Sequence, residues 1–404
     1  MPESASLLSQ RAINVAPSPT LAITAKANAL KASGVDVVGF GAGEPDFDTP
    51  EFVKQAAVDA LAKGYTKYTP SAGIPALKQA IVDKMRRDSG LEYAPGNVIV
   101  SCGGKHSLYN IFQAMCEHGD EVIIPAPYWV SYPEQVRLAD ATPVIIETTD
   151  ALGFVPTVAQ IEAAITPRTK LFVLNSPSNP TGAMWSRETI ETLAELAVKH
   201  DFYVISDEIY EKICYDGNVP ISIATLSPEM KRRTIIVNGV SKTYSMTGWR
   251  IGYAVAEETS VIAAMGRIQD AVTSNPTSIA QYAAVAAITG DQAFLGEWLS
   301  EFDRRRHVIV DGLNRIPGVT CLMPKGAFYV FPNISACFGK RTPDDKVSGS
   351  SDDLAAYLLE SVQVAVVPGS GFGAGDYVRL SYATSMAAIE KGVTRIGEAV
   401  SKLA

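Results

Sequence analysis

A lysine that follows an apolar, β-rich run carries the most specific chemistry in this chain. Lys242 comes after residues 234–238, in a segment that ends at Arg250. A buried ammonium group costs free energy unless its charge is removed, and a Schiff base with an aldehyde removes it. Pyridoxal phosphate is held in this way, and Arg250 could bind its phosphate through two parallel hydrogen bonds. Taken alone, the segment fits equally well a surface turn with two solvated cations.

Other side chains that suit a pyridine cofactor follow predicted strands. A buried carboxylate such as Asp207 would keep the ring nitrogen protonated. Tyr210 and Asn179 could both contact the ring oxygen, and Trp129 offers a flat surface for stacking. Each of these residues also has a structural explanation, as a cap, a turn or a core side chain. Their order along the chain is more specific than any one of them.

A glycine turn provides a candidate anion site. Residues 98–101 predict a buried strand, Gly103-Gly104-Lys105 follows it, and a helix is expected from there to about Glu117. Free N–H groups and the helix dipole would face an anion at this helix N-terminus, near Gly104.

Strands and helices alternate through the middle of the chain. We expect strands at 98–101, 121–125, 144–147, 171–175, 203–210, 234–238 and 251–255, with helices at 104–117, 158–165 and 187–200. This order predicts an α/β fold with a mostly parallel sheet covered by helices on both faces. Ligands of such sheets bind beyond the carboxyl ends of the strands. Gly104, Asn179, Asp207 and Lys242 all fall there, which favours a cofactor site over a surface turn.

The length of 404 residues predicts two domains. We expect a large domain over residues 46–290 and a small α+β domain formed by residues 1–45 together with 291–404. The small domain should hold a long helix at 292–315, and strands at 319–323, 326–331, 364–367 and 377–382. Residues 340–353 are polar and predict a mobile surface loop.

Composition excludes several classes of protein. The chain is 47% hydrophobic and 19% charged, as in globular proteins, and its net charge of −8 argues against nucleic-acid binding. No apolar run approaches the roughly 20 residues of a membrane span. Residues 1–19 lack the apolar core of a signal peptide, so we expect a cytoplasmic protein. The five cysteines and four histidines have no metal-ligand spacing, and no metal is expected.

Five motifs together resemble the class I aminotransferases of fold type I, which depend on pyridoxal phosphate. They are GAGEPDF at 41–47, NSPSNPTG at 175–182, SDEIY at 206–210, Ser241-Lys242 with Arg250, and RLSYA at 379–383. The resemblance runs from about residue 11 to the end of the chain. The sequence around Gly104 and at residues 128–133 is similar to that of the bacterial branch of aspartate and aspartate/prephenate aminotransferases.

The resemblance implies a role for each residue in turn. Lys242 would form the Schiff base and move a proton between substrate and cofactor, Asp207 would pair with the ring nitrogen, and Tyr210 and Asn179 would contact the ring oxygen. The phosphate would be held by Arg250, the backbone at Gly104 and Lys105, and Ser241. Tyr68 would reach the phosphate of a neighbouring subunit, which implies a homodimer with shared active sites. Arg379 would bind the substrate α-carboxylate, with the Gly43 backbone and Trp129 closing over it.

The side-chain pocket is less specific. In one branch of the family an arginine binds the second carboxylate of the substrate. Asp270 stands at the position of that arginine here. In the branch that this chain resembles, Lys105 with Ser18 and Thr20 does this work, and all three are present. The implied reaction moves an amino group between L-aspartate, or another acidic amino acid, and 2-oxoglutarate by a ping-pong mechanism. Glutamate, prephenate and aromatic substrates stay open, because a lysine is a point charge that tolerates acids of different shape.

Parts of the sequence also suggest other functions. A tailoring enzyme with the same cofactor site remains an alternative, because a fold does not fix its chemistry. A transcription regulator on the same fold would carry an added DNA-binding domain, for which there is no signal. The glycine-rich run 369–375 suggests a nicotinamide site, but the helix and the acid that such a site requires do not follow.

Overall fold

The computed structural model describes residues 7–404 and is built around one seven-stranded sheet. Six strands run parallel, and β8 runs against its neighbours β2 and β7. In spatial order the strands are β2 (Val98–Ser101), β8 (Gly252–Ala256), β7 (Thr234–Gly239), β6 (Tyr203–Asp207), β5 (Thr169–Asn175), β3 (Glu121–Pro125) and β4 (Thr142–Ile146). The prediction of a mostly parallel sheet is confirmed.

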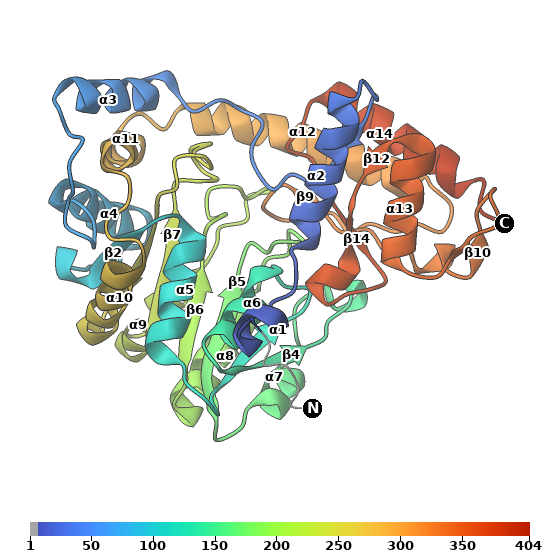
Figure 1. Cartoon of the computed structure of the whole chain (residues 1–404). Helices are drawn as coiled ribbons and strands as arrows, with labels where there is room; N and C mark the ends of the chain where they lie inside the picture. Colours follow the sequence, from blue (N-terminus) through green and yellow to red (C-terminus); the bar gives the residue numbers. More distant parts are fainter. Residues whose placement is uncertain (1–6) are drawn as a thin grey trace.

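Helices cover both faces of this sheet because its strands are buried on both sides. One face packs on α5 (Gly104–Met115), α6 (Ser131–Leu138) and α10 (Thr259–Val272). The other packs on α4 (Pro75–Ser89), α7 (Val158–Ala164), α8 (Arg187–His200) and α9 (Pro228–Arg233). Beyond α4 lie α3 (Glu51–Ala62) and α11 (Ser278–Thr289), which pack on each other at one side of the molecule (Figure 1).

A second group of elements lies at the other side of the molecule, on the right of Figure 1. Its three-stranded sheet has the order β13-β14-β9 and is antiparallel. The strands and helices of the group are α2 (Pro19–Ala32), β1 (Val38–Gly39), α12 (Phe294–Asn314), β9 (Tyr329–Val330), β10 (Lys340–Arg341), β11 (Val347–Ser348), α13 (Ser351–Val362), β12 (Val364–Ala365), β13 (Val367–Pro368), β14 (Val378–Ser381) and α14 (Met386–Val400). The short helix α1 (Gln10–Asn14) lies apart from this group, near α6, where Arg11 pairs with Asp140 (Figure 1).

The N-terminal segment packs on this second group. β1 pairs in parallel with β12, so that Val38 lies beside Val364. Earlier in the segment, Arg11 and Ala16 instead contact Asp140 and Glu134, so the contacts of residues 7–45 do not decide the predicted division. We keep the predicted division of the chain as a proposal and call its two parts the large and the small domain below.

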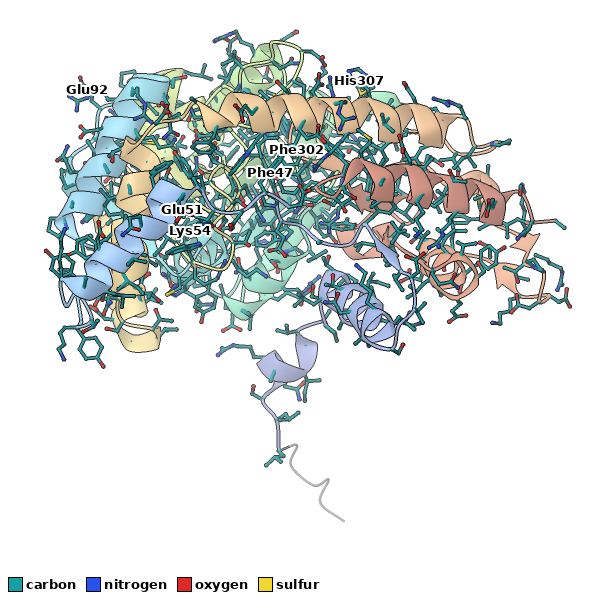
Figure 2. All side chains as sticks on the ribbon, turned by 90° about the horizontal axis from the view of Figure 1, so that it is seen from above. Phe47, Glu51, Lys54, Glu92, Phe302 and His307 are labelled. Atoms are coloured by element: carbon teal, nitrogen blue, oxygen red, sulfur yellow. The ribbon has the colours of Figure 1, made fainter. Side chains whose placement is uncertain are left out.

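The segment that leads from the small into the large domain is held against α12. The ring of Phe47 stacks on Trp298 at a centroid distance of 4.7 Å and meets the edge of Phe302 at 5.1 Å (Figure 2). Next to it, the Asp46 carboxylate lies 2.7 Å from Arg305. α12 therefore fixes the passage between the two parts of the chain.

Two local predictions are wrong. The polar stretch 340–353 is not a loop, because β10 and β11 form an antiparallel hairpin there, and Ser350 then caps α13 through the Asp353 N–H. Residues 319–323 form no strand, and Thr320 makes a single bridge to Asn333. Within residues 7–404 no helix combines the length and the apolar character that a membrane span requires. The expected cytoplasmic location is not tested by this and stays a prediction.

Candidate active site

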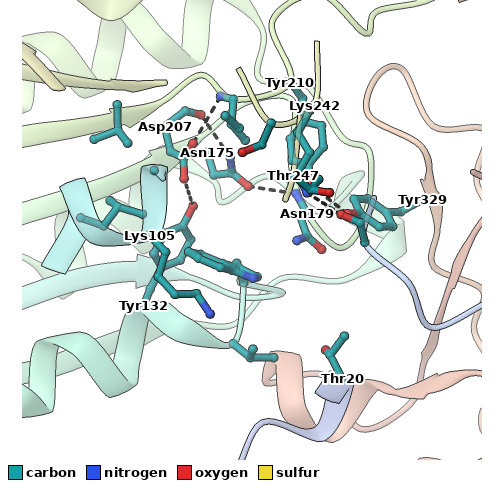
Figure 3. A pocket seen from close by; sticks show the side chains of 18 of the residues that line it. Thr20, Lys105, Tyr132, Asn175, Asn179, Asp207, Tyr210, Lys242, Thr247 and Tyr329 are labelled. Atoms are coloured by element: carbon teal, nitrogen blue, oxygen red, sulfur yellow. Dashed lines mark hydrogen bonds between the residues drawn. The ribbon is translucent and has the colours of Figure 1, made fainter. Parts of the chain in front are cut away.

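A pocket of about 300 Å³ lies at the carboxyl ends of β5, β6 and β7 and is closed on the other side by the small domain. All but one of the predicted site residues line it. They are Ser18, Thr20, Gly43, Gly104, Lys105, Trp129, Asn179, Asp207, Tyr210, Ser241, Lys242, Arg250 and Arg379. Figure 3 shows Lys242, Tyr210 and Tyr329 close together, with Lys105 farther across the pocket.

Lys242 stands in the turn after β7, and its side chain reaches into the pocket. Its Nζ donates a hydrogen bond to the Gly43 carbonyl, which comes from the small-domain segment. Burial lowers the pKa of Lys242 to about 8, although the negative charge of Glu44 opposes the shift. A large fraction of this amine is therefore neutral slightly above neutral pH, and a neutral amine is the form that attacks a carbonyl group.

Asp207 ends β6 in the middle of the sheet. Its Oδ2 accepts a hydrogen bond of 2.6 Å from the Tyr132 hydroxyl, and its Oδ1 accepts one of 3.3 Å from the Ile209 N–H. Burial nevertheless raises the pKa of Asp207 to about 6, because these two donors only partly replace water. A buried carboxylate of this kind is suited to a cationic ring nitrogen.

Two asparagines connect the strand ends to the small domain. Asn175 at the end of β5 donates 3.1 Å to the Asp207 carbonyl and accepts 2.9 Å from the Asn179 N–H. The Asn179 Oδ1 in turn accepts 3.0 Å from Arg379. The Nδ2 of Asn179 is left to donate toward the pocket.

Arg379 on β14 is 2% exposed. Its guanidinium carbon lies 4.6 Å from the ring centre of Tyr329 and 5.1 Å from that of Phe372. Its Nη2 donates 2.8 Å to the Gly41 carbonyl, but its buried Nε has no partner among the described residues. The guanidinium also has no carboxylate partner in residues 7–404, so it is a buried cation with donors left for an anion.

The N-terminus of α5 and Arg250 form a cradle next to Lys242. Gly103 precedes the helix with a φ of +91°, and a Cβ there would lie 2.3 Å from an Nη atom of Arg250. The Arg250 guanidinium is held by the carbonyls of Thr247, at 2.9 Å, and Cys102, at 3.2 Å. A guanidinium beside a helix N-terminus provides convergent donors for a phosphate.

Lys105 and Trp129 stand at another side of the pocket. The Lys105 Nζ lies 4.9 Å from the centre of the Trp129 ring, and Ser18 and Thr20 line the wall near the start of α2. Burial lowers the pKa of Lys105, and the positive charge of Arg250 adds to this shift. An incoming carboxylate would relieve both effects.

Tyr68 is the predicted site residue that does not line this pocket. It is 91% exposed, in the segment between α3 and α4. This position is compatible with a role in a neighbouring subunit, which stays a prediction.

Several lining residues were not predicted from the sequence. Tyr132, Asn175, Thr247 and Tyr329 all have polar atoms at the pocket. Tyr132 and Asn175 stand inside two of the quoted motifs, so their positions carried a signal. Tyr329 carried none, because its partners lie far away in the chain.

Comparisons with known proteins agree with the fold and the pocket. A model of the family "Aminotransferase class I and II" matches residues 35–396. The chain is 53% identical to an aspartate aminotransferase of Geobacillus stearothermophilus over 392 residues, covering 96% of this chain and 98% of that protein. It is 47% identical to an aspartate/prephenate aminotransferase of Nitrosomonas europaea, covering 98% of this chain and 100% of that protein.

A solved structure gives the same result. The crystal structure of the aspartate aminotransferase from Rhizobium meliloti matches with a TM-score of 0.95 at 46% identity, covering 99% of this chain and 100% of that one. The fold and the pocket define an α/β enzyme in which a buried lysine with a lowered pKa and a buried arginine line one cavity. The chain belongs to the class I and II aminotransferase family. The predictions of family, fold and enzyme type are confirmed.

Proposed function

We propose that this enzyme transfers the amino group of L-aspartate to 2-oxoglutarate with pyridoxal phosphate as its cofactor. The observation that carries the proposal is one pocket that holds a lysine with a lowered pKa, a buried carboxylate and a buried arginine with donors to spare. The names of the similar proteins supply the substrate, since all three are aspartate or aspartate/prephenate aminotransferases. Prephenate is not preferred over aspartate.

The residues present fit pyridoxal phosphate. The buried Nε of Arg379 has no partner among the described residues, and Gly103 lets the Arg250 guanidinium lie directly beside the N-terminus of α5. Asp207 would hold the ring nitrogen, Trp129 would cover the ring, and Arg250 with the α5 N–H groups and Ser241 would hold the phosphate. When bound, the cofactor supplies an aldehyde for amine exchange and a ring that accepts the electron pair released at the substrate α-carbon.

The protein's own groups then divide the work. Asp207 keeps the proton on the ring nitrogen, because a buried anion stabilises the cation beside it. Tyr210 and the Nδ2 of Asn179 donate to the ring oxygen. Lys242 would take the proton from the substrate α-carbon and deliver it to the cofactor carbon C4′, a task that its pKa of about 8 suits.

Two cations would orient the substrate. Arg379 binds the α-carboxylate and is kept in place by Asn179 and by the rings on either side. Lys105, supported by Ser18 and Thr20, receives the side-chain carboxylate. A dicarboxylate held at both ends presents its α-carbon in one orientation, which lowers the entropic part of the barrier.

We also propose a homodimer in which Tyr68 binds the phosphate in the partner's pocket. The exposure of Tyr68 in the single chain supports this, since 91% of its surface is exposed. Other exposed apolar side chains lie on α3, on the segment that follows α3, and at the end of α10. They are Val58, Leu61, Tyr65 and Val272.

The reaction is tested with the purified protein loaded with pyridoxal phosphate. We expect a visible absorbance band, and ping-pong kinetics with aspartate and 2-oxoglutarate. Lys242→Ala should remove the band and lower kcat by at least about 10⁴-fold, because the nucleophile and the proton carrier are lost together. Lys199→Ala, at an exposed position on α8 outside the pocket, serves as the control. Wild-type turnover by Lys242→Ala would overturn the proposal.

A further inference from the structure

A pair of buried tyrosines joins the two sides of the pocket. Tyr210 follows β6 in the large domain, and Tyr329 lies on β9 in the small domain. Their hydroxyl oxygens are 2.8 Å apart, and their rings meet edge to face with centroids at 5.8 Å. Only 2% of Tyr210 and 1% of Tyr329 is exposed. The single proton of each hydroxyl is therefore directed at a group inside the pocket rather than at water.

Tyr329 is held in place on every side. Its ring faces the Arg379 guanidinium at 4.6 Å, and β9 pairs with β14 so that Tyr329 lies opposite Ser381, two residues after that arginine. Its hydroxyl lies against Gly43, where a Cβ would come within 3.0 Å of the oxygen. Among the described residues, Tyr210 is its one hydrogen-bond partner. The hydroxyl thus contributes to the pocket through Tyr210.

We propose that Tyr329 is a positioning residue that donates its proton to the Tyr210 oxygen and so directs the Tyr210 proton at the ring oxygen of the cofactor. The inference rests on the proposed function, which assigns the ring oxygen to Tyr210. Each hydroxyl has one proton and can also accept. Only the order Tyr329, Tyr210, ring oxygen leaves the Tyr210 proton free for the cofactor. With the opposite order, Tyr210 would spend its proton on Tyr329.

The pKa values of both hydroxyls are raised, so each keeps the proton that this order requires. Burial raises the pKa of Tyr329, and the positive charge of Arg379 is the main effect opposing that shift, as it also opposes the shift of Tyr210. Burial also raises the pKa of Tyr210 well above its usual value. Because hydrogen bonds in a chain polarise one another, a donor to Tyr210 strengthens the bond that Tyr210 itself donates.

The consequence is measurable in the spectrum of the loaded enzyme. A ring oxygen that receives a weaker hydrogen bond holds negative charge less well and keeps a nearby proton more firmly. Tyr329→Phe, which removes only the hydroxyl, should move the pH midpoint of the visible absorbance change upward by about half a unit. The ring beside Arg379 remains, so KM for aspartate should change little.

Tyr382→Phe is the matched control. Its hydroxyl is also buried and lies 3.1 Å from another tyrosine, Tyr215, but outside the pocket. This substitution removes the same group from the same core and should leave the absorbance midpoint unchanged. Thermal unfolding of both variants measures the cost of losing a buried hydroxyl, which a purely structural role of Tyr329 would share.

The decisive measurement repeats the substitution without Tyr210. In a Tyr210→Phe background, Tyr329→Phe should add no further shift, because its path to the cofactor is gone. An unchanged midpoint in the single variant, or an equal shift in both backgrounds, overturns the inference and leaves the proposed function intact. A wild-type protein that takes up pyridoxal phosphate without a visible band overturns the proposed function, and the inference with it.

Discussion

At the scale of single residues, Asp207 is a buried carboxylate whose charge is costly for the fold alone. Its carboxylate is 5% exposed, in the middle of the sheet, and its one side-chain donor is Tyr132. Burial raises its pKa to about 6, above the ordinary value of 3.8. The folded chain without cofactor therefore binds this proton more firmly than the unfolded chain does. The contribution of this one group to stability is greatest below pH 4 and is lost as the pH rises through about 6.

Asp207→Asn should remove this loss. We expect the cofactor-free variant to be more stable than the cofactor-free wild type by up to about 3 kcal/mol at pH 8, with a smaller gain at pH 5. Denaturant unfolding at both values measures the difference, and Asp311→Asn, at an exposed carboxylate on α12, is the control. A gain of the same size at both pH values would contradict the role of burial. Transaminase activity should be lost, because an amide cannot hold the ring proton.

The sequence predicted the residues that act alone better than those that act in pairs. Lys242, Asp207 and Arg379 stand in short motifs whose order along the chain is specific, and they meet in one pocket. Tyr132 makes a hydrogen bond to Asp207, which is 75 residues away in the sequence. Tyr329 makes one to Tyr210, which is 119 residues away. Such partners are chosen by the packing of distant elements, which no local spacing encodes.

At the scale of elements, the site depends on how closely β8 approaches α5. A Cβ on Gly252 of β8 would lie 2.1 Å from the backbone nitrogen of Gly104, the first residue of the helix. Glycine at this strand position therefore lets the helix N-terminus come close to the sheet. The sequence predicted the strand, the glycine turn and the helix, but not that the neighbouring strand presses on the same backbone. The hairpin of β10 and β11 was missed for a similar reason, because its polar residues give no local signal that the two strands pair.

Gly252→Ala should push α5 away from the sheet and weaken the phosphate cradle. We expect a loss of about 1–3 kcal/mol in unfolding free energy and a cofactor Kd raised by at least about tenfold. Equilibrium dialysis against pyridoxal phosphate and denaturant unfolding measure the two effects. Gly266→Ala in α10, where a Cβ meets nothing within 4 Å, should instead stabilise the chain by about 0.5–1 kcal/mol. Unchanged cofactor affinity in Gly252→Ala would argue against the cradle.

At the scale of the whole molecule, one chain builds a pocket from both of its parts and leaves Tyr68 outside it. Asp207 and Lys242 come from the large domain, and Arg379 and Tyr329 come from the small domain. The alternation of strands and helices along the sequence predicted that Asp207 and Lys242 lie at strand ends. The role proposed for Tyr68 requires a second copy of the chain, so the contacts of the single chain do not test it.

Mixed dimers test the shared site directly. Lys242→Ala and Tyr68→Ala subunits are each expected to be impaired as pure dimers. In a mixed dimer, the pocket with an intact Lys242 receives an intact Tyr68 from the other subunit, so one wild-type site returns. Activity of the separated mixed dimer should approach half of the wild-type value, with size measured by light scattering. A mixed dimer no more active than the Tyr68→Ala parent would place Tyr68 in its own pocket, or in none.

The order of the pocket residues along the chain also has a consequence for biosynthesis. All seven strands of the central sheet, together with Lys242 and Arg250, lie within residues 98–256. Arg379 is synthesised 129 residues after Arg250 (379 − 250), which takes roughly ten seconds at ordinary translation speeds. On the ribosome, the groups that would hold the vitamin-derived coenzyme therefore emerge well before the arginine that would bind the α-carboxylate of the amino acid.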